Sequence, residues 1–402
     1  MRRRLVLPSL VALASVYGAS ACGAGWEQAP WPTEAWAPAP PESVGLDSAP
    51  LRALHAQIAA GRYGHVDRLV VVRNGFVVLT ERYLRDYQEI SRGARSAIGC
   101  GWESCRDSSA IHEFNYLHPE FHPWYRGRDL HTLQSVTKSV AATVVGLAIA
   151  QGAIGGVDAP VLSFLTSYDL SRADPRLHQV TLAHVLTMRS GIEWHETDRP
   201  LDSTNTTAQL EWSADWVQFT LDQPMDAAPG AKWVYNSGGS HLLSAVIQRA
   251  TGRTIDAYAE EHLFAPLGIT EYHWKREPRG LPDTEGGLYL EAEQLAKIGY
   301  LYLHDGVWDG RRLLPEGWVE AATARQVERT GVRDWGYGYQ WWRLDRDSVA
   351  VWAAQGFGGQ SLLVLPERNI VAVLNAWNVF GGRVRDVLGP TLDALIAAST
   401  PS

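Results

Sequence analysis

Apolar and polar residues define two elements near the N-terminus of this chain. Residues 68–82 contain two apolar runs on either side of Asn74 and Gly75. An Asn-Gly pair between apolar runs predicts a tight β-hairpin, because both residues accept the left-handed backbone that such a turn requires. Apolar residues also recur at helical spacing between Ser48 and Ile58, which predicts a short helix with Ser48 as its cap.

The middle of the chain has mainly helical patterns. Residues 84–130 are polar and aromatic, and we expect an irregular excursion there. An apolar stretch then runs from Leu133 to Leu147, which predicts a helix that ends near Gly152. Between residues 155 and 290, apolar residues follow helical spacing in four segments, which are 181–188, 214–221, 240–250 and 255–263.

The C-terminal part returns to strand patterns. Residues 336–342 have a β signal, and the apolar runs 361–365 and 370–374 predict a hairpin, followed by a helix over about 383–398. Strands and a helix at both ends of the chain predict an α/β fold of the α+β type. We expect one antiparallel sheet, built from both termini and flanked by helices, with an inserted, mainly helical subdomain at roughly residues 155–290.

The first 21 residues have the features of an export signal. Residues 2–4 are arginines, residues 5–16 are apolar, and residues 19–21 form a small-residue cleavage site. The apolar region is too short to span a bilayer. Residues 22–43 are rich in Pro and Ala and predict a linker, so we expect one folded domain at residues 44–400 of an exported protein.

The three cysteines agree with an oxidising compartment. Cys100 and Cys105 are close enough in sequence to pair across a small loop. Cys22 directly follows the predicted cleavage site, a position that suits a lipid-anchored cysteine. A protein tethered to the cell envelope through Cys22 and a periplasmic or secreted protein cut after Ala21 both remain open. Contact with a membrane is expected only through that anchor.

Composition and charge argue against several classes of function. The net charge is −8 and no basic run occurs beyond residues 2–4, so nucleic acid is not an expected partner. Four histidines lack the spacing of a zinc site, and we expect neither a metal nor a cofactor; they are His112, His118, His122 and His131. Several of the 17 tryptophans flank predicted loops, either as pocket walls or as packing residues: Trp194, Trp212, Trp216, Trp335, Trp341 and Trp342.

Lys138 is the most informative residue of the chain. Lysine occurs only at positions 138, 232, 275 and 297, yet Lys138 lies inside an apolar stretch. Arginine stays charged near neutral pH, whereas a buried lysine can lose its proton and act as a base. Ser135 lies three residues earlier and shares a helix face with it. This spacing predicts a serine nucleophile with a lysine base, and the Ser135 amide at the helix start is a free donor for an oxyanion.

Two further segments carry candidate chemistry. Tyr235 precedes a Gly-Gly pair and a predicted helix, a loop position from which a phenol can relay a proton. The glycine-rich segment 355–360 leads into a predicted strand, and glycines at a sheet edge permit close backbone approach to a ligand. We therefore expect the amide of Gly359 to be the second oxyanion donor, with Gly358 and Gln360 in contact with substrate.

Together these segments resemble the serine β-lactamase-like hydrolases. That group includes class C β-lactamases, DD-peptidases, family VIII carboxylesterases and nylon-oligomer hydrolases, and Ser-x-x-Lys is one of its signatures. The resemblance covers roughly residues 44–400. It rests on segments that fall in the family order, namely 43–46, 70–83, 135–139, 184–191, 229–239 and 263–268.

The resemblance implies that Ser135 is the nucleophile, Lys138 its base partner and Tyr235 the second acid/base group. The family commonly has Tyr-x-Asn, whose asparagine contacts the substrate amide, and Ser237 stands at that position here. Where β-lactam-processing relatives carry a cation on the last hairpin, this chain has the uncharged segment 356–358. Both departures weaken the β-lactamase interpretation and favour the nylon-oligomer hydrolase and esterase branches.

These observations predict an exported serine hydrolase that cleaves a small-molecule ester or amide through a Ser135 acyl-enzyme, with acid–base catalysis by Lys138 and Tyr235. Two alternatives stay open. A DD-peptidase or weak β-lactamase would use the same residues on the cell envelope or on β-lactams. A non-catalytic envelope binding protein would keep the fold without turnover, although the complete Ser-Lys-Tyr set argues against it.

Overall fold

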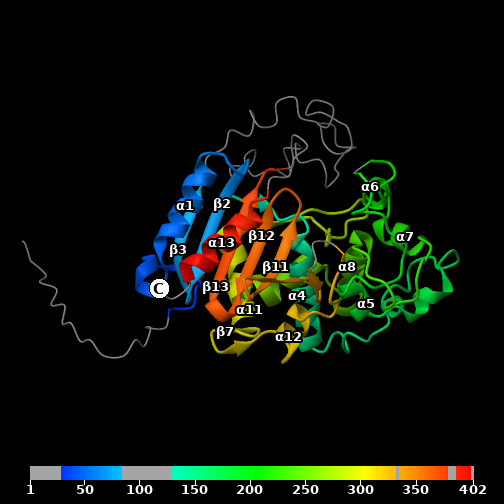
Figure 1. The fold of residues 1–402 in the computed structure, drawn as a ribbon. Helices are drawn as coiled ribbons and strands as arrows, with labels where there is room; N and C mark the ends of the chain where they lie inside the picture. The colour runs from blue at the N-terminus through cyan, green and yellow to red at the C-terminus, as the bar shows by residue number, and fades with distance from the viewer. Residues whose placement is uncertain (1–28, 84–128, 201, 332–334, 379–385, 400–402) are drawn as a thin grey trace, which may run out of the picture.

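The computed structural model describes residues 29–83, 129–200, 202–331, 335–378 and 386–399. Its centre is a sheet of eight strands (Figure 1) in the order β1-β3-β2-β13-β12-β11-β10-β9. In that order the strands are Ala37–Pro38, Phe76–Arg82, Val66–Arg73, Ile370–Ala376, Gln360–Leu365, Val349–Gly356, Trp342–Arg346 and Gly336–Tyr337. All neighbours pair antiparallel except β1, which lies parallel to β3. The predicted mainly antiparallel sheet with flanking helices is confirmed.

Two predicted hairpins form the middle of this sheet. β2 and β3 pair around Asn74 and Gly75, whose φ angles of 51° and 82° are the left-handed pair that an Asn-Gly turn adopts. β12 and β13 pair around the turn at residues 366–369. β13 also pairs with β2. The N-terminal and C-terminal parts of the chain therefore share one sheet.

Helices cover both faces of the sheet (Figure 1). Helices α1 (Ser48–Ala59) and α13 (Leu388–Ser399) pack together on one face, and α11 (Ala292–Leu303) packs on the other. Strand side chains alternate between the two sides, so that Leu363 joins the core beneath α1 and α13 while Leu362 joins the core beneath α11. Both faces are thus buried, which explains why these strands are continuous apolar runs.

A mainly helical region lies beside the sheet (Figure 1). It adjoins α4 (Val136–Ala150), which is buried along almost its whole length. Its helices are α5 (Leu182–Leu186), α6 (Thr206–Trp212), α7 (Trp216–Leu221), α8 (Ser237–Thr251), α9 (Ile255–Ala259) and α10 (Ala265–Leu267). A small sheet adds β4 (His131–Thr132), β6 (Leu288–Leu290) and β5 (His273–Trp274). The short hairpin of β7 (Val307–Trp308) and β8 (Arg311–Arg312) and helix α12 (Trp318–Thr323) follow α11.

Two local predictions differ from the structure. The cap of α1 is Asp47, whose carboxylate accepts the N–H of Ala49, whereas Ser48 is the first helical residue. Residues 336–342 do not form one strand. β9 ends at Tyr337 and β10 begins at Trp342, and the bend between them contains Gln340, whose φ is 60°. Glycine and aromatic content indicated a strand there but did not reveal this bend.

The segment predicted as a linker packs onto the domain from residue 29 onward. Trp31 and Trp36 contact the ring of Tyr300 on α11 edge-on, with centroid separations of 5.5 and 5.4 Å. β1 then adds to the sheet beside β3. The Pro- and Ala-rich composition is typical of a linker, but the two indole rings bury enough apolar surface to hold the segment in place.

Several predictions lie outside the described residues. They concern the export signal at residues 1–21, Cys22, the Cys100–Cys105 pair, and the histidines at positions 112, 118 and 122. Within the part of the chain that is described, no helix is long and apolar enough to cross a membrane.

Candidate active site

Ser135 stands at the start of α4, which begins at Val136. Gln134 precedes it with a φ of 49°, unusual for a residue other than glycine, and its amide donates to the Thr132 hydroxyl at 2.9 Å. A residue keeps this strained backbone conformation only where the surrounding structure holds it, and residues of this kind are concentrated at functional sites. Ser135 is partly exposed between buried neighbours. Its N–H donates to no backbone carbonyl of the described residues and is therefore available to a ligand.

Lys138 lies one turn into α4 and is only 1% exposed. Its Nζ atom donates to Oγ of Ser135 at 2.9 Å. The same nitrogen donates to the backbone carbonyl oxygen of Glu285 at 2.6 Å and lies 3.3 Å from the carboxylate atom Oε2 of that residue. The structure therefore brings the predicted nucleophile and base together, and adds a glutamate that the sequence analysis missed.

Tyr235 lies on the loop just before α8. The Nζ atom of Lys138 is 5.2 Å from its ring centroid, and the ring stacks on Trp342 at 5.8 Å with 17° between the planes. Burial raises the pKa of the phenol, while the charge of Lys138 and a hydrogen bond with Ser135 act in the opposite direction. Because the pKa lies above its ordinary value, the phenol keeps its proton at neutral pH and can act as a donor.

Aromatic side chains surround this stacked pair. Trp233, Trp335 and Tyr337 contact the ring of Trp342 edge-on, with centroid separations of 5.9, 5.7 and 4.8 Å. Of the tryptophans predicted to flank loops, Trp342 therefore stacks on Tyr235, and Trp335 contacts Trp342. Among the described residues, the neighbours of Trp342 named here are aromatic rings.

The end of β11 lies against the peptide that precedes Ser135. β10 pairs with β11 only as far as Ala353, so the last residues of β11 have β12 on one side and no strand on the other. A Cβ atom on Gly356 would lie 2.4 Å from the Leu133 carbonyl oxygen and 3.0 Å from Cβ of Gln134. Only glycine permits this approach, which places a strand edge beside the nucleophile.

The predicted oxyanion glycine lies in the turn that follows. Gly358 and Gly359 have φ angles of 84° and 100°, and the Gly358 carbonyl accepts the N–H of Asn378. A Cβ atom on Gly359 would meet Ala376 at 3.0 Å, at the end of β13. The roles of Gly358 and Gly359 stay predictions, whereas the backbone of Gly356 packs directly on Leu133 and Gln134, the two residues before Ser135.

Ser237 and Gln360 form hydrogen bonds inside the protein. Both are fully buried. Ser237 donates to the carboxylate of Glu196 from its N–H at 3.0 Å and from its hydroxyl at 2.8 Å. The side-chain amide of Gln360 donates to the carbonyls of Ala376 at 2.5 Å and Phe357 at 3.2 Å. The substrate contact expected of these two side chains stays a prediction.

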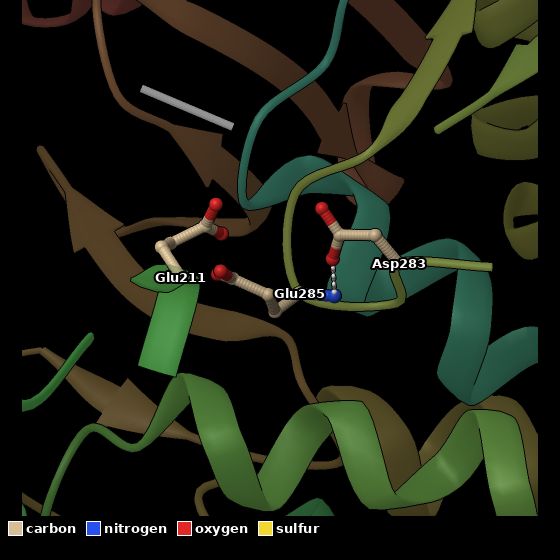
Figure 2. Close-up of side chains that lie close together, drawn as sticks. All are labelled: Glu211, Asp283 and Glu285. Carbon is tan, nitrogen blue, oxygen red and sulfur yellow. Dashed lines mark hydrogen bonds between the residues drawn. The ribbon is translucent and has the colours of Figure 1, made fainter. Parts of the chain in front are cut away.

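Three buried carboxylates lie close together (Figure 2), and one of them belongs to Glu285, which contacts Lys138. Glu211 on α6, and Asp283 and Glu285 on the loop before β6, are buried and each has an oxygen within 4.8 Å of the others. Asp283 also accepts the backbone N–H groups of residues 285 and 286, at 2.9 and 3.1 Å. The ammonium group of Lys275 lies 3.5 Å from Glu211. Within the described residues, this is the one group of three carboxylates close enough together to hold a cation. Lys275 supplies positive charge to it, and so does Lys138 whenever its amine is protonated.

Burial sets the charge states in this interior. It raises the pKa of Asp283 to about 7, with repulsion from Glu285 in the same direction and attraction from Lys275 opposing it. Burial also raises the pKa of Glu196, against the attraction of Lys138. It lowers the pKa of His241, on α8, to about 4, so that imidazole is neutral at physiological pH. The site therefore rests on a buried network in which carboxylates and lysines balance one another.

His131 does not join this network. It is buried, its ring lies 4.2 Å from that of Trp377 between centroids, and burial lowers its pKa to about 3. Two other lysines are also remote from the nucleophile. Lys232 is exposed and pairs with Asp226, and Lys297 donates to two backbone carbonyls near the N-terminal segment.

The sequence analysis missed the buried acidic residues. One usable signal was the segment 275–285, where one of only four lysines is followed by Glu277, Asp283 and Glu285 directly before an apolar strand. Charged residues so close to a buried strand are typically paired. Glu211 has no comparable local signal, because Lys275 lies far away in the sequence. Glu196 accepts from the nearby Trp194, but Ser237, which donates to it twice, is also distant in the sequence.

Comparison with known proteins places this geometry in context. The profile of the family described as Beta-lactamase matches residues 113–398. A 6-aminohexanoate-dimer hydrolase of Paenarthrobacter ureafaciens is 26% identical over 68% of this chain and 74% of its own length. Esterase EstB of Burkholderia gladioli is 31% identical over 35% of this chain and 38% of its own. The solved structure of a family VIII carboxylesterase superposes with a TM-score of 0.59 at 16% identity, over 90% of this chain and 98% of that one, a likeness that concerns the fold.

Proposed function

Because this chain belongs to the beta-lactamase family and is a serine hydrolase of that fold, we propose that it cleaves a small-molecule ester or amide through an acyl-enzyme on Ser135. The observation that carries the proposal is the 2.9 Å contact between Nζ of Lys138 and Oγ of Ser135. A serine hydroxyl is a weak nucleophile until an adjacent base removes its proton. The partial exposure of Ser135 leaves this oxygen open to a carbonyl carbon.

Acylation begins with a proton transfer from Ser135 to Lys138. As the Oγ–H bond breaks, Nζ of Lys138 takes the proton and Oγ forms a bond with the carbonyl carbon of the substrate. The carbonyl oxygen becomes an oxyanion, which the Ser135 N–H can hold together with a second backbone donor. Gly359 is the predicted second donor, and the close packing of Gly356 on the two residues before Ser135 favours the neighbouring end of β11 for this task.

Collapse of the tetrahedral intermediate requires a proton for the leaving group. Tyr235 can donate it, because its raised pKa keeps the phenol protonated at neutral pH. The leaving alcohol or amine then departs and the acyl group stays on Ser135. A water molecule attacks the acyl carbon and gives a proton to the Tyr235 phenolate, Lys138 returns its proton to Oγ as the bond between Oγ and the acyl carbon breaks, and the acid is released.

The border of the site supports an uncharged substrate. Strand β11 and the turn after it, residues 349–359, contain no Lys, Arg or His. A carboxylate such as that of a β-lactam would therefore lack a cationic partner there. The rings around Trp342 offer apolar contact instead. Two relatives, a 6-aminohexanoate-dimer hydrolase and an esterase, agree by name with an amide or ester substrate.

The proposal also includes the cellular location of the enzyme. Residues 1–21 have the charged, apolar and small-residue regions of an export signal, and Cys22 follows them. We infer an exported enzyme, either free or lipid-anchored. Fractionation of the native host and mass analysis of the mature N-terminus would test this, and a full-length chain in the cytoplasm would overturn it.

Activity on a substrate panel tests the proposed reaction. Purified protein should hydrolyse short-chain p-nitrophenyl esters or aminohexanoate-type amides faster than nitrocefin or penicillin. Ser135→Ala should abolish this activity, and Tyr235→Phe should lower kcat by about 100-fold while it keeps the ring stack on Trp342. Turnover of β-lactams alone would favour the envelope alternative, and an unchanged rate in Ser135→Ala would refute the proposal.

A further inference from the structure

We propose that Glu285 is the third member of a Ser135–Lys138–Glu285 relay, in which it is a positioning residue that orients the amine of Lys138 and stabilises its ammonium form. The inference rests on the proposed acyl-enzyme function. It concerns the carboxylate of Glu285, which is buried and lies 3.3 Å from Nζ of Lys138.

The hydrogen-bond geometry around Lys138 carries the proposal. A neutral amine has two N–H bonds and one lone pair, and three acceptor atoms surround Nζ: the carbonyl oxygen of Glu285 at 2.6 Å, its Oε2 atom at 3.3 Å and Oγ of Ser135 at 2.9 Å. When both N–H bonds donate to Glu285, the lone pair is left facing the Ser135 hydroxyl. Glu285 thereby selects the orientation in which Lys138 can accept a proton.

The same carboxylate matters after proton transfer. The Ser135 proton becomes a third N–H bond on Lys138, which turns the amine into a cation in a position only 1% exposed. A buried cation without a partner is costly, because water no longer solvates it. The carboxylate of Glu285, itself only 2% exposed, offsets that cost at the moment the charge forms. In serine hydrolases that use a histidine base, a buried carboxylate likewise orients the imidazole and stabilises its charged form.

Charged groups from several elements face this pair. Glu285 contacts Lys138 and also belongs to the group of buried carboxylates with Glu211 and Asp283 (Figure 2), where Lys275 lies 3.5 Å from Glu211. Among the described residues, titratable or charged groups face this pair from several elements: Ser135 at the start of α4, Glu196 on the loop before α6, Glu211 on α6, Tyr235 on the loop before α8, His241 on α8, and Lys275 and Asp283 between β5 and β6. The Glu285 carboxylate lies 3.3 Å from the Lys138 amine nitrogen.

Two substitutions separate orientation from charge. Glu285→Gln keeps an oxygen that can accept from Lys138 but removes the negative charge, so Lys138 holds its proton less tightly. We expect the acid limb of the kcat/KM profile for a p-nitrophenyl ester to move to lower pH by about one unit, and the plateau kcat to fall about tenfold with little change in KM. Glu285→Ala removes orientation as well and should lower kcat further.

Glu277→Gln is the matched control. Glu277 is equally buried and lies on the same stretch of chain, but its carboxylate accepts the N–H of Leu281 rather than Lys138. Its substitution should lower the melting temperature without any shift of the acid limb. Glu285→Asp, which keeps the charge, should restore most of the rate, and it serves as the second test if Glu285→Gln folds poorly.

The outcomes distinguish this inference from the proposed function. If the wild type hydrolyses no ester or amide, the proposed function itself fails. If the wild type is active and Ser135→Ala is inactive, but folded Glu285→Gln keeps the wild-type profile, only the relay is overturned. A fall in melting temperature with an unmoved acid limb would assign Glu285 a purely structural role, and would also overturn it.

Discussion

The amine nitrogen of Lys138 lies 2.9 Å from the hydroxyl oxygen of Ser135. If this amine is the base, Lys138→Arg should lower kcat/KM for an ester by about 100- to 10,000-fold, because a guanidinium does not give up its proton near neutral pH. Lys232→Arg is the matched control, since Lys232 is exposed and pairs only with Asp226 among the described residues. A Lys138→Arg variant with near-wild-type rate would exclude this lysine as the base.

Gly356 packs too closely on Leu133 and Gln134 to accept a side chain. Its Cβ would lie 2.4 Å from the Leu133 carbonyl oxygen, so Gly356→Ala must shift β11 or the start of α4. Because displacement of reacting groups by about 1 Å costs up to about 100-fold in rate, we expect kcat to fall by at least tenfold. Gly155→Ala, at a site with open space, should leave the rate unchanged. Equal rates in the two variants would show that β11 does not define the site.

Replacement of Ser237 tests whether this residue has a structural role or contacts the substrate. Its hydroxyl donates to Glu196 inside the protein, so Ser237→Ala should lower the free energy of unfolding by about 1–3 kcal/mol through an unsatisfied carboxylate oxygen. KM should stay within about twofold of the wild type. Denaturant unfolding and steady-state kinetics measure both quantities. A large rise in KM without loss of stability would support the original expectation that this residue contacts substrate.

Asp283 makes stability depend on pH in a defined direction. Its folded pKa of about 7 lies above the ordinary value near 4, so the folded state binds the proton more tightly than the unfolded state. The stabilisation is complete below about pH 4 and is lost as the pH rises to about 7. Asp283→Asn should therefore become more stable relative to the wild type between pH 5 and pH 8, by several degrees in Tm. A difference in Tm that is constant over this range would contradict the assignment.

The core of the site could be predicted from sequence because it is local. Ser135 and Lys138 are one helical turn apart, so spacing alone places their side chains on one face. Asn74 and Gly75 likewise define their own turn. Tyr235 was found by its position before a Gly-Gly pair, and its place beside Lys138 came from the family resemblance rather than from spacing.

The supporting network could not be predicted because its contacts are long-range. Glu285 reaches Lys138 across 147 positions of sequence, and no periodic pattern links such residues. The hydrogen bond that the Ser237 hydroxyl donates to Glu196 was not predicted either. The segment 29–43 was expected to be a linker, because composition alone does not reveal that Trp31 and Trp36 have a partner in Tyr300. In each case the missing information was the identity of a distant partner.

Covalent labelling of Ser135 tests the central claim most directly. Purified protein is treated with a fluorophosphonate, and the modified residue is identified by peptide mass spectrometry while ester hydrolysis is followed in parallel. We predict one adduct, on Ser135, that forms at the rate at which activity is lost, and no adduct in Ser135→Ala. A protein that hydrolyses esters while Ser135 stays unmodified, or an equally labelled Ser135→Ala variant, would contradict the account.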